Sequence, residues 1–150
     1  MVTLTPMSDD AFAEWAPGMW ADYRADLIRA GSSEAAADEN VARNQATTMP
    51  DGRLAPDQHV FDVREGDETV GVVWLAQRDT EWFVYNLEIA EGFRGRGLGR
   101  QALQAAERLA RESGGTTIGL SVFGFNDVAQ RLYASEGYQT VQTAMTKRLV

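Results

Sequence analysis

The stretch Phe93-Arg94-Gly95-Arg96-Gly97-Leu98-Gly99-Arg100 decides the fold of this chain. Three glycines alternate with larger residues, and three arginines lie among them. An apolar run typical of a strand, residues 82–89, precedes the stretch, and a run typical of a helix, residues 101–110, follows it. A glycine-rich turn from a strand into a helix directs several backbone N–H groups to one point, where the helix dipole adds partial positive charge. The stretch therefore predicts a phosphate site, here for the diphosphate of a nucleotide-like cofactor.

The length and composition of the chain predict one globular domain over residues 1–150. No apolar run approaches the roughly 18 residues that span a bilayer, and the first ten residues lack the basic and apolar segments of a secretory signal. We therefore expect a cytoplasmic protein without membrane attachment. The chain has no cysteine and one histidine, His59. This composition excludes disulfides, a cysteine nucleophile and metal sites built from thiolates or several histidines, so we expect no metal.

The charge of the chain limits its partners. The formal net charge is −8 and the sequence pI is about 4.6. Nucleic-acid binding needs a basic surface and is not expected. The overall field favours a cationic small molecule or a basic peptide. The arginines at positions 94, 96 and 100 would form a local positive island for an anion.

Hydrophobic periodicity and turn residues predict alternating strands and helices along the chain. The expected strands cover residues 2–5, 59–64, 69–76, 81–89, 117–122, 138–141 and 145–149. The expected helices run from the N-cap Ser8 to Gly31, from Ser32 or Ser33 to about Thr47, from Gly97 to Ser113, and from the N-cap Asn126 to Ser135. Pro17-Gly18 would break or kink the first helix. The order predicts an α/β fold of the α+β type, with a mixed, mostly antiparallel sheet of six or seven strands and helices on both faces.

The glycine stretch matches two common phosphate-binding patterns poorly. Gly97-x-Gly99-x-x-Ala102 formally fits the dinucleotide pattern, but the next strand ends without the acidic residue that this pattern requires. The P-loop pattern is absent. A tight turn with solvated arginines and no ligand is the remaining alternative.

Two spaced motifs give a better match. Arg94-x-x-Gly97-x-Gly99 is followed, after one strand, by Asn126-Asp-Val-Ala129 and Leu132-Tyr133-Ala-Ser-Glu-Gly137-Tyr138. Together they resemble the GNAT acetyltransferases, with Tyr138 in place of a phenylalanine. Met145-Thr-Lys147 is similar to a closing segment found in general GNAT proteins of undefined substrate.

The resemblance implies a fold and a cofactor. Acetyl-CoA would lie in a V-shaped gap where the strands at 82–89 and 117–122 splay apart. Backbone N–H groups of the glycine stretch would hold the pyrophosphate, and the pantetheine would pair with the strand edge near Leu87–Ile89. The resemblance also allows a homodimer. The expected cofactor-binding residues are Leu87, Ile89, Arg94, Gly95, Arg96, Gly97, Leu98, Gly99, Arg100, Asn126 and Tyr133.

The implied reaction is the transfer of an acetyl group from acetyl-CoA to a primary amine of a small molecule or peptide, by direct attack in a ternary complex. A non-catalytic acyl-CoA sensor is the alternative, and the length of the acyl chain stays open. The resemblance makes Tyr133 the acid that protonates the leaving thiolate, since a phenol with a pKa near 10 is protonated at neutral pH. Tyr133 could instead be a packing aromatic, and Asn126 a plain helix N-cap.

The general base is expected at Glu88, a carboxylate in an otherwise apolar strand beside the proposed gap, where burial would make it a stronger base. The alternative is a charged residue at a strand end, paired with an arginine. Glu81 and a chain of water molecules are the other candidates.

Overall fold

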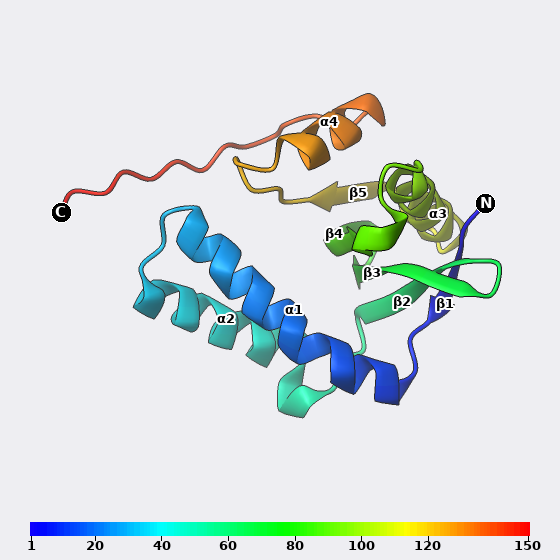
Figure 1. The fold of residues 1–150 in the computed structure, drawn as a ribbon, viewed down its shortest axis with the longest axis horizontal. Helices are drawn as coiled ribbons and strands as arrows, with labels where there is room; N and C mark the ends of the chain where they lie inside the picture. Colours follow the sequence, from blue (N-terminus) through cyan, green and yellow to red (C-terminus); the bar gives the residue numbers. More distant parts are fainter. The chain divides into compact units, whose positions relative to one another are not determined.

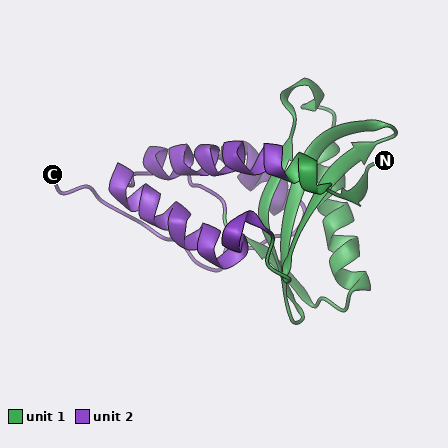
Figure 2. Ribbon diagram, turned by 90° about the horizontal axis from the view of Figure 1, so that it is seen from below, with its two compact units in different colours: residues 1–12, 54–121 green, residues 13–53, 122–150 purple.

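The computed structural model describes residues 1–150 and divides the chain into two compact units, which Figure 2 shows in different colours. Residues 1–12 and 54–121 form the first unit, which contains the sheet. Residues 13–53 and 122–150 form the second unit, which is mostly helical. Figure 1 shows the elements along the chain, which are β1 (Thr3–Pro6), α1 (Asp9–Arg29), α2 (Glu34–Thr48), β2 (Gln58–Glu65), β3 (Glu68–Arg78), β4 (Glu81–Ile89), α3 (Leu98–Glu112), β5 (Thr117–Leu120) and α4 (Asp127–Ser135), with short 3₁₀ turns at Pro50–Gly52 and Glu91–Phe93.

The sheet of the first unit has the strand order β1-β2-β3-β4-β5. The first four strands pair antiparallel, and β5 pairs parallel to β4. A parallel pair needs a crossover connection, and α3 supplies it between β4 and β5. The predicted α+β class, with a mixed and mostly antiparallel sheet, is confirmed.

One face of the sheet is covered by α3, whose buried side chains recur at helical spacing. Several of them are alanines, which let the helix axis approach the sheet closely. The buried cluster of this unit includes Val63, Val70, Val73, Leu75, Trp82 and Val84 from the sheet and Leu98, Ala102, Ala105, Ala106 and Ala110 from α3. This packing fixes the first turn of α3 against the end of β4.

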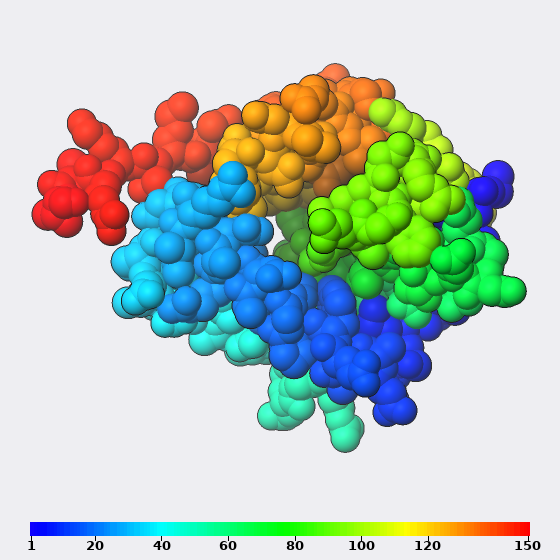
Figure 3. All heavy atoms as spheres, viewed as in Figure 1, coloured from blue at the N-terminus to red at the C-terminus, as the bar shows by residue number.

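The predicted closing strands at 138–141 and 145–149 are wrong, and the sheet has five strands rather than six or seven. The residues after α4 adopt no regular structure. The large apolar side chains Val141, Met145 and Leu149 are 85–96% exposed, and Figure 3 shows the red atoms of this segment open to the surroundings. A strand forms only when its backbone pairs with another strand, and sequence alternation does not reveal whether a partner edge is available.

The second unit contains a helical hairpin. Ser8, just before α1, accepts a hydrogen bond from the Ala11 N–H at 3.2 Å and so caps the helix as expected. The helix continues through Pro17, so the predicted break is wrong, while the kink stays a prediction. Proline removes one hydrogen bond from the ladder, and the rest of this 21-residue helix keeps its ladder. Tyr23 donates to Asn40 Oδ1 at 3.0 Å and so ties α1 to α2.

Candidate functional site

The strands β4 and β5 part after only four paired residues. Their pairing runs from Glu81 beside Thr117 to Val84 beside Leu120, whereas β4 continues to Ile89. One extra residue, Tyr85, interrupts the pairing of β4 with β3 at the same point. Such a β-bulge bends its strand and increases the twist. The bulge therefore gives a physical reason for the parting, and the predicted splayed strand pair is confirmed.

The end of β4 presents backbone groups to the opened edge. The Ala90 N–H donates to Val70 O at 2.8 Å, so the backbone groups of Ala90 point toward β3. In an antiparallel pair, alternate residues direct their backbone N–H and C=O groups to the partner strand. Leu87 and Ile89 therefore direct their backbone groups to the other side. Arg94 Nε donates to Ile89 O at 2.8 Å, which agrees with this direction. An extended ligand with amides of its own could pair with this edge.

The glycine turn forms an open cradle at the head of α3. Gly95 and Gly97 have φ values of 80° and 76°, and no atom lies within 4 Å of a Cβ built on either residue. Gly97 is the N-cap and offers no side-chain cap. The first intrahelical bond of the turn runs from the Gln101 N–H to Gly97 O at 3.2 Å. The N–H groups of Leu98 and Gly99 precede this bond at the head of the helix and suit an anion.

A diphosphate fits this cradle because glycine leaves its space empty and the helix dipole favours negative charge. The side chain of Leu98 is 2% exposed and anchors the first turn of α3 in the core. The anchoring keeps the amides in place before any ligand arrives. The cradle is thus attached to the core of the first unit.

The arginines of the turn have acidic neighbours. Arg96 Nη2 donates to Glu65 Oε1 at 2.6 Å, and Arg94 Nη2 lies 3.8 Å from Glu88 Oε1. The predicted positive island is therefore partly offset by carboxylates, which leaves the backbone amides as the more direct anion donors.

The predicted burial of Glu88 is wrong. Its side chain is 52% exposed and lies near Arg94, as the ion-paired alternative anticipated. The bulge accounts for this position. It keeps Leu87 and Ile89 packed toward the core, so Glu88 between them points to the opposite face of the sheet.

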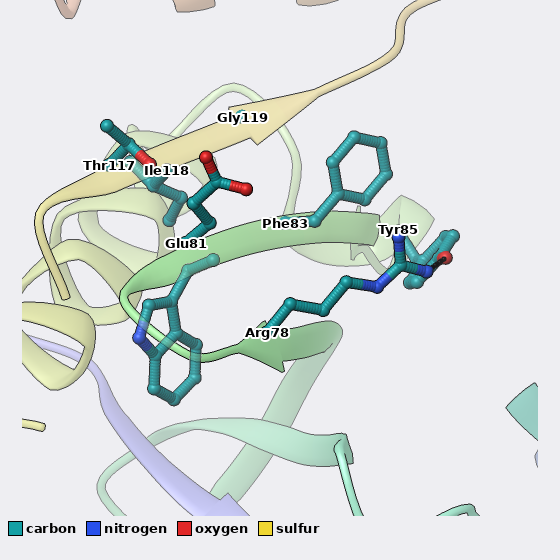
Figure 4. A pocket seen from close by; sticks show the side chains of 8 residues that line it. Arg78, Glu81, Phe83, Tyr85, Thr117, Ile118 and Gly119 are labelled. Atoms are coloured by element: carbon teal, nitrogen blue, oxygen red, sulfur yellow. Dashed lines mark hydrogen bonds between the residues drawn. The ribbon is translucent and has the colours of Figure 1, made fainter.

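A pocket of about 360 Å³ lies on the paired part of β4 and β5, from the pair Glu81 and Thr117 to the pair Phe83 and Gly119 (Figure 4). Phe83 and Tyr85 supply aromatic surface, with ring centroids 4.9 Å apart. Arg78 Nη2 donates to Tyr85 Oη at 3.2 Å. The lining residues are Arg78, Glu81, Trp82, Phe83, Tyr85, Thr117, Ile118 and Gly119.

Two predicted site residues, Asn126 and Tyr133, belong to the second unit. Asn126 Oδ1 accepts a hydrogen bond from the Ala129 N–H at 3.1 Å, which confirms that Asn126 caps α4. Tyr133 lies on α4 and meets the ring of Tyr138 edge to face, with centroids 5.8 Å apart. Burial raises the pKa of the Tyr133 phenol above its usual value, because the charged form loses its hydration. The phenol is therefore protonated at neutral pH.

The sequence motifs did not single out two features of the first unit. Gln101, in the first turn of α3, has a buried Oε1 without a hydrogen-bond partner, and it occupies a position that the motif leaves unspecified. The bulge at Tyr85, by contrast, is visible in the hydrophobic pattern of the sequence. Val84 and Leu87 are both core residues although they are an odd number of positions apart, which an unbroken strand does not allow.

The parted parallel strands and the glycine turn at the head of α3 define an α+β acetyltransferase fold. The chain belongs to the acetyltransferase (GNAT) family, whose model matches residues 12–138. The resemblance drawn from the two sequence motifs is confirmed.

Similar proteins support an acetyltransferase. Two uncharacterized N-acetyltransferases of Bacillus subtilis (strain 168) are similar over nearly the whole chain. YycN is 28% identical over 99% of each chain, and YdgE is 29% identical over 98% of each. The crystal structure of YycN superposes with a TM-score of 0.90 at 27% identity, over 100% of this chain and 99% of that one. AAC(6')-Iy in complex with the bisubstrate analog CoA-S-monomethyl-acetylneamine shares the fold, with a TM-score of 0.60 at 13% identity over 99% and 97% of the two chains. None of the helices is both long and apolar enough to cross a membrane.

Proposed function

We propose that this chain transfers an acetyl group from acetyl-CoA to a primary amine of a small molecule or peptide, by direct attack in a ternary complex in the cytoplasm. The observation that carries the proposal is the open cradle at Gly95–Gly97 beside the edge of β4 that has parted from β5. The cradle suits the diphosphate, and the edge suits an extended chain with amides.

Acetyl-CoA supplies an activated acyl thioester. The amides at the head of α3 would hold its diphosphate, and Leu87 and Ile89 would pair with its pantetheine through their backbone groups. Asn126 would contact the same arm while it caps α4. The buried Oε1 of Gln101 would accept a hydrogen bond from a donor of the bound ligand, which would satisfy that atom.

Acyl transfer forms a C–N bond and breaks the C–S bond. A backbone N–H among residues 87–89 would donate to the carbonyl oxygen as negative charge develops there. Tyr133 would give its proton to the departing thiolate, and its raised pKa keeps that proton available. The proton of the attacking amine would pass to Glu88, directly or through water, with Glu81 as a further acceptor.

The acceptor would enter through the pocket on the paired part of β4 and β5. Phe83 and Tyr85 offer aromatic faces and Glu81 offers a carboxylate, a set that suits an ammonium or an alkylamine. The net charge of −8 favours a cationic acceptor in the same way.

One observation favours a second candidate function, a non-catalytic acyl-CoA sensor. The exposed Glu88 near Arg94 leaves β4 without a buried carboxylate to act as base. A sensor would bind the thioester through the same cradle and would not need that base.

Calorimetry with CoA at low salt, followed by a free-thiol assay over a panel of neutral and cationic amines, separates these outcomes. We expect CoA to bind and at least one amine to release thiol from acetyl-CoA. Absence of CoA binding would overturn the proposal, and binding without turnover on any amine would establish the sensor. Propionyl-CoA and succinyl-CoA in the same assay define the acyl preference.

Substitution of one phenol tests the assigned acid. We expect Tyr133→Phe to slow turnover about 10²-fold or more and to leave the affinity for CoA nearly intact. Tyr138→Phe is the matched control, because it removes a phenol from the neighbouring ring and should leave the rate unchanged. A Tyr133→Phe rate equal to that of the parent would remove the role.

A further inference from the structure

The pocket on β4 and β5 contains a cationic side chain that has no anionic partner. Arg78 lines this pocket together with Phe83 and Tyr85. Its guanidinium donates to Tyr85 Oη at 3.2 Å and forms no ion pair. A guanidinium presents five N–H donors in a planar fork that fits a carboxylate. Most of these donors are therefore open to a ligand in the pocket.

A series of contacts across three strands holds this guanidinium in place. The ring of Tyr85 stacks on the ring of Trp74, with centroids 4.6 Å apart and an angle of 29° between the planes. Trp74 is buried and donates from Nε1 to Oε1 of Gln58, which is also buried, at 2.8 Å. The series runs from β2 through β3 to β4, which are paired along their length. Because Arg78 is already positioned, an anion that binds it has less side-chain freedom to remove.

The other walls of the pocket are apolar or lie away from the guanidinium. The rings of Phe83 and Tyr85 supply aromatic surface. A Cβ on Gly119 would have Phe83 Cδ2 as its nearest neighbour, at 3.9 Å, so the glycine leaves room beside that ring. Figure 4 shows the Arg78 side chain running toward Tyr85, whereas the carboxylate of Glu81 lies apart from the guanidinium. The pocket therefore suits a ligand with one anionic group and an apolar body.

The position of the pocket connects it with the proposed reaction. The pocket ends one pair before the last pair of the two strands, and Tyr85 follows at the bulge. A group bound to Arg78 thus lies near the point where the strands part. The edge proposed for the thioester arm, residues 87–89, begins two residues further along β4. An amine that is only a few bonds from the bound anion would therefore stand close to the thioester.

We infer that the acceptor is an amino acid with an apolar side chain, whose carboxylate binds Arg78 and whose side chain lies against Phe83. The inference rests on the proposed acetyl transfer and names the substrate class of that site. The amine nitrogen forms the C–N bond while the C–S bond breaks, as proposed above, and the carboxylate is unchanged. The net charge of −8 repels anions from the chain as a whole, so a carboxylate needs a local cation such as Arg78.

Matched pairs of acceptors test the carboxylate. The free-thiol assay compares phenylalanine with phenethylamine, and leucine with 3-methylbutylamine, since the members of each pair differ only in the carboxylate. We expect kcat/KM to be about 10- to 100-fold higher for the amino acids, from hydrogen bonds to a charged group.

Variants of exposed arginines assign this preference to one side chain. Arg78→Gln should remove the preference, keep the rate with the amines and leave the circular dichroism unchanged, because Arg78 is exposed. Arg78→Lys keeps the charge without the fork and should retain part of the preference. Arg108→Gln, at an exposed position of α3, is the matched control and should retain all of it. An equal preference in the parent and in Arg78→Gln would overturn the inference.

Calorimetry with two probes that lack an amine tests the pocket without turnover. The probes are 3-phenylpropanoate and its neutral amide, 3-phenylpropanamide. We expect the carboxylate to bind the parent about 10-fold more tightly than the amide, and the two probes to bind Arg78→Gln equally. Added salt should weaken only the carboxylate. Equal affinities in the parent would overturn the inference even where acetyl transfer is found, whereas absence of CoA binding would overturn the proposed function itself.

Discussion

Gly97→Ala should separate the stability of the fold from the binding of the cofactor. Gly97 has a φ of 76° and open space around a Cβ. Alanine there would meet no protein atom, and its only cost in the free protein is the left-handed backbone, about 1–2 kcal/mol. For a chain of this length that cost lowers the melting temperature by roughly 2–8 °C. The new methyl group would stand where the diphosphate approaches the amides.

The expected loss of affinity follows from those amides. Each hydrogen bond to a charged oxygen contributes about 1.5–3 kcal/mol, so the loss of one weakens CoA binding by roughly 10- to 100-fold. Gly97→Glu adds bulk and negative charge and should abolish binding. Calorimetry with CoA and thermal unfolding measure the two effects on the same preparations.

The other end of α3 supplies the matched control. Gly114 has a φ of 83° and also has no atom within 4 Å of a Cβ. Gly114→Ala should therefore lower stability by a similar amount and leave the affinity for CoA unchanged. Equal affinities in Gly97→Ala and the parent, or an equal loss in both variants, would refute the assignment of the cradle.

Two further predictions concern the end of β4 and the phenol of α4. A Cβ on Gly71 would overlap Glu88 O and lie 2.9 Å from Ile89 Cδ1, so Gly71→Ala should cost about 1–3 kcal/mol in urea unfolding and weaken CoA binding. Gly92→Ala, which meets no atom within 4 Å, should change neither quantity, and a neutral Gly71→Ala would contradict the pairing of Gly71 with Ile89. The pKa of Tyr133 is raised in the folded state, so its stabilising effect is complete below the unfolded value near 10 and is lost as the pH rises through the folded pKa. The free energy of unfolding should fall less steeply between about pH 9 and 11 in Tyr133→Phe than in the parent, and equal slopes would contradict this.

Local signals in the sequence predicted the elements well up to the end of α4. The strand at 81–89 has the predicted bounds, and Asn126 caps the last helix as expected. Both depend on features that lie next to one another in the chain. The closing strands depend on a distant partner edge, so the alternation at Val141 and Met145 could not reveal that no pairing forms.

The residues of the candidate site also divide into those that the local sequence could assign and those that it could not. Glycine at positions 95 and 97 could be assigned to the cradle because positive φ and close approach require that residue type. The surroundings of Glu88 could not be assigned, because its face is set by the bulge and its charged neighbour by the path of the turn. The only sequence signal of the bulge is the broken alternation of Val84 and Leu87, and the charged neighbour Arg94 comes from the turn after the strand.

The bulge at Tyr85 determines which face of the sheet each later residue of β4 occupies. Removal of one residue between Val84 and Leu87 would exchange odd and even positions, so the carboxylate of Glu88 would turn toward α3 and the amides of Leu87 and Ile89 toward β3. A substitution in this strand changes one side chain, whereas the deletion of one residue here moves every later side chain of the strand to the opposite face. Loss of one residue would thus remove the ligand edge without touching any residue of the glycine motif.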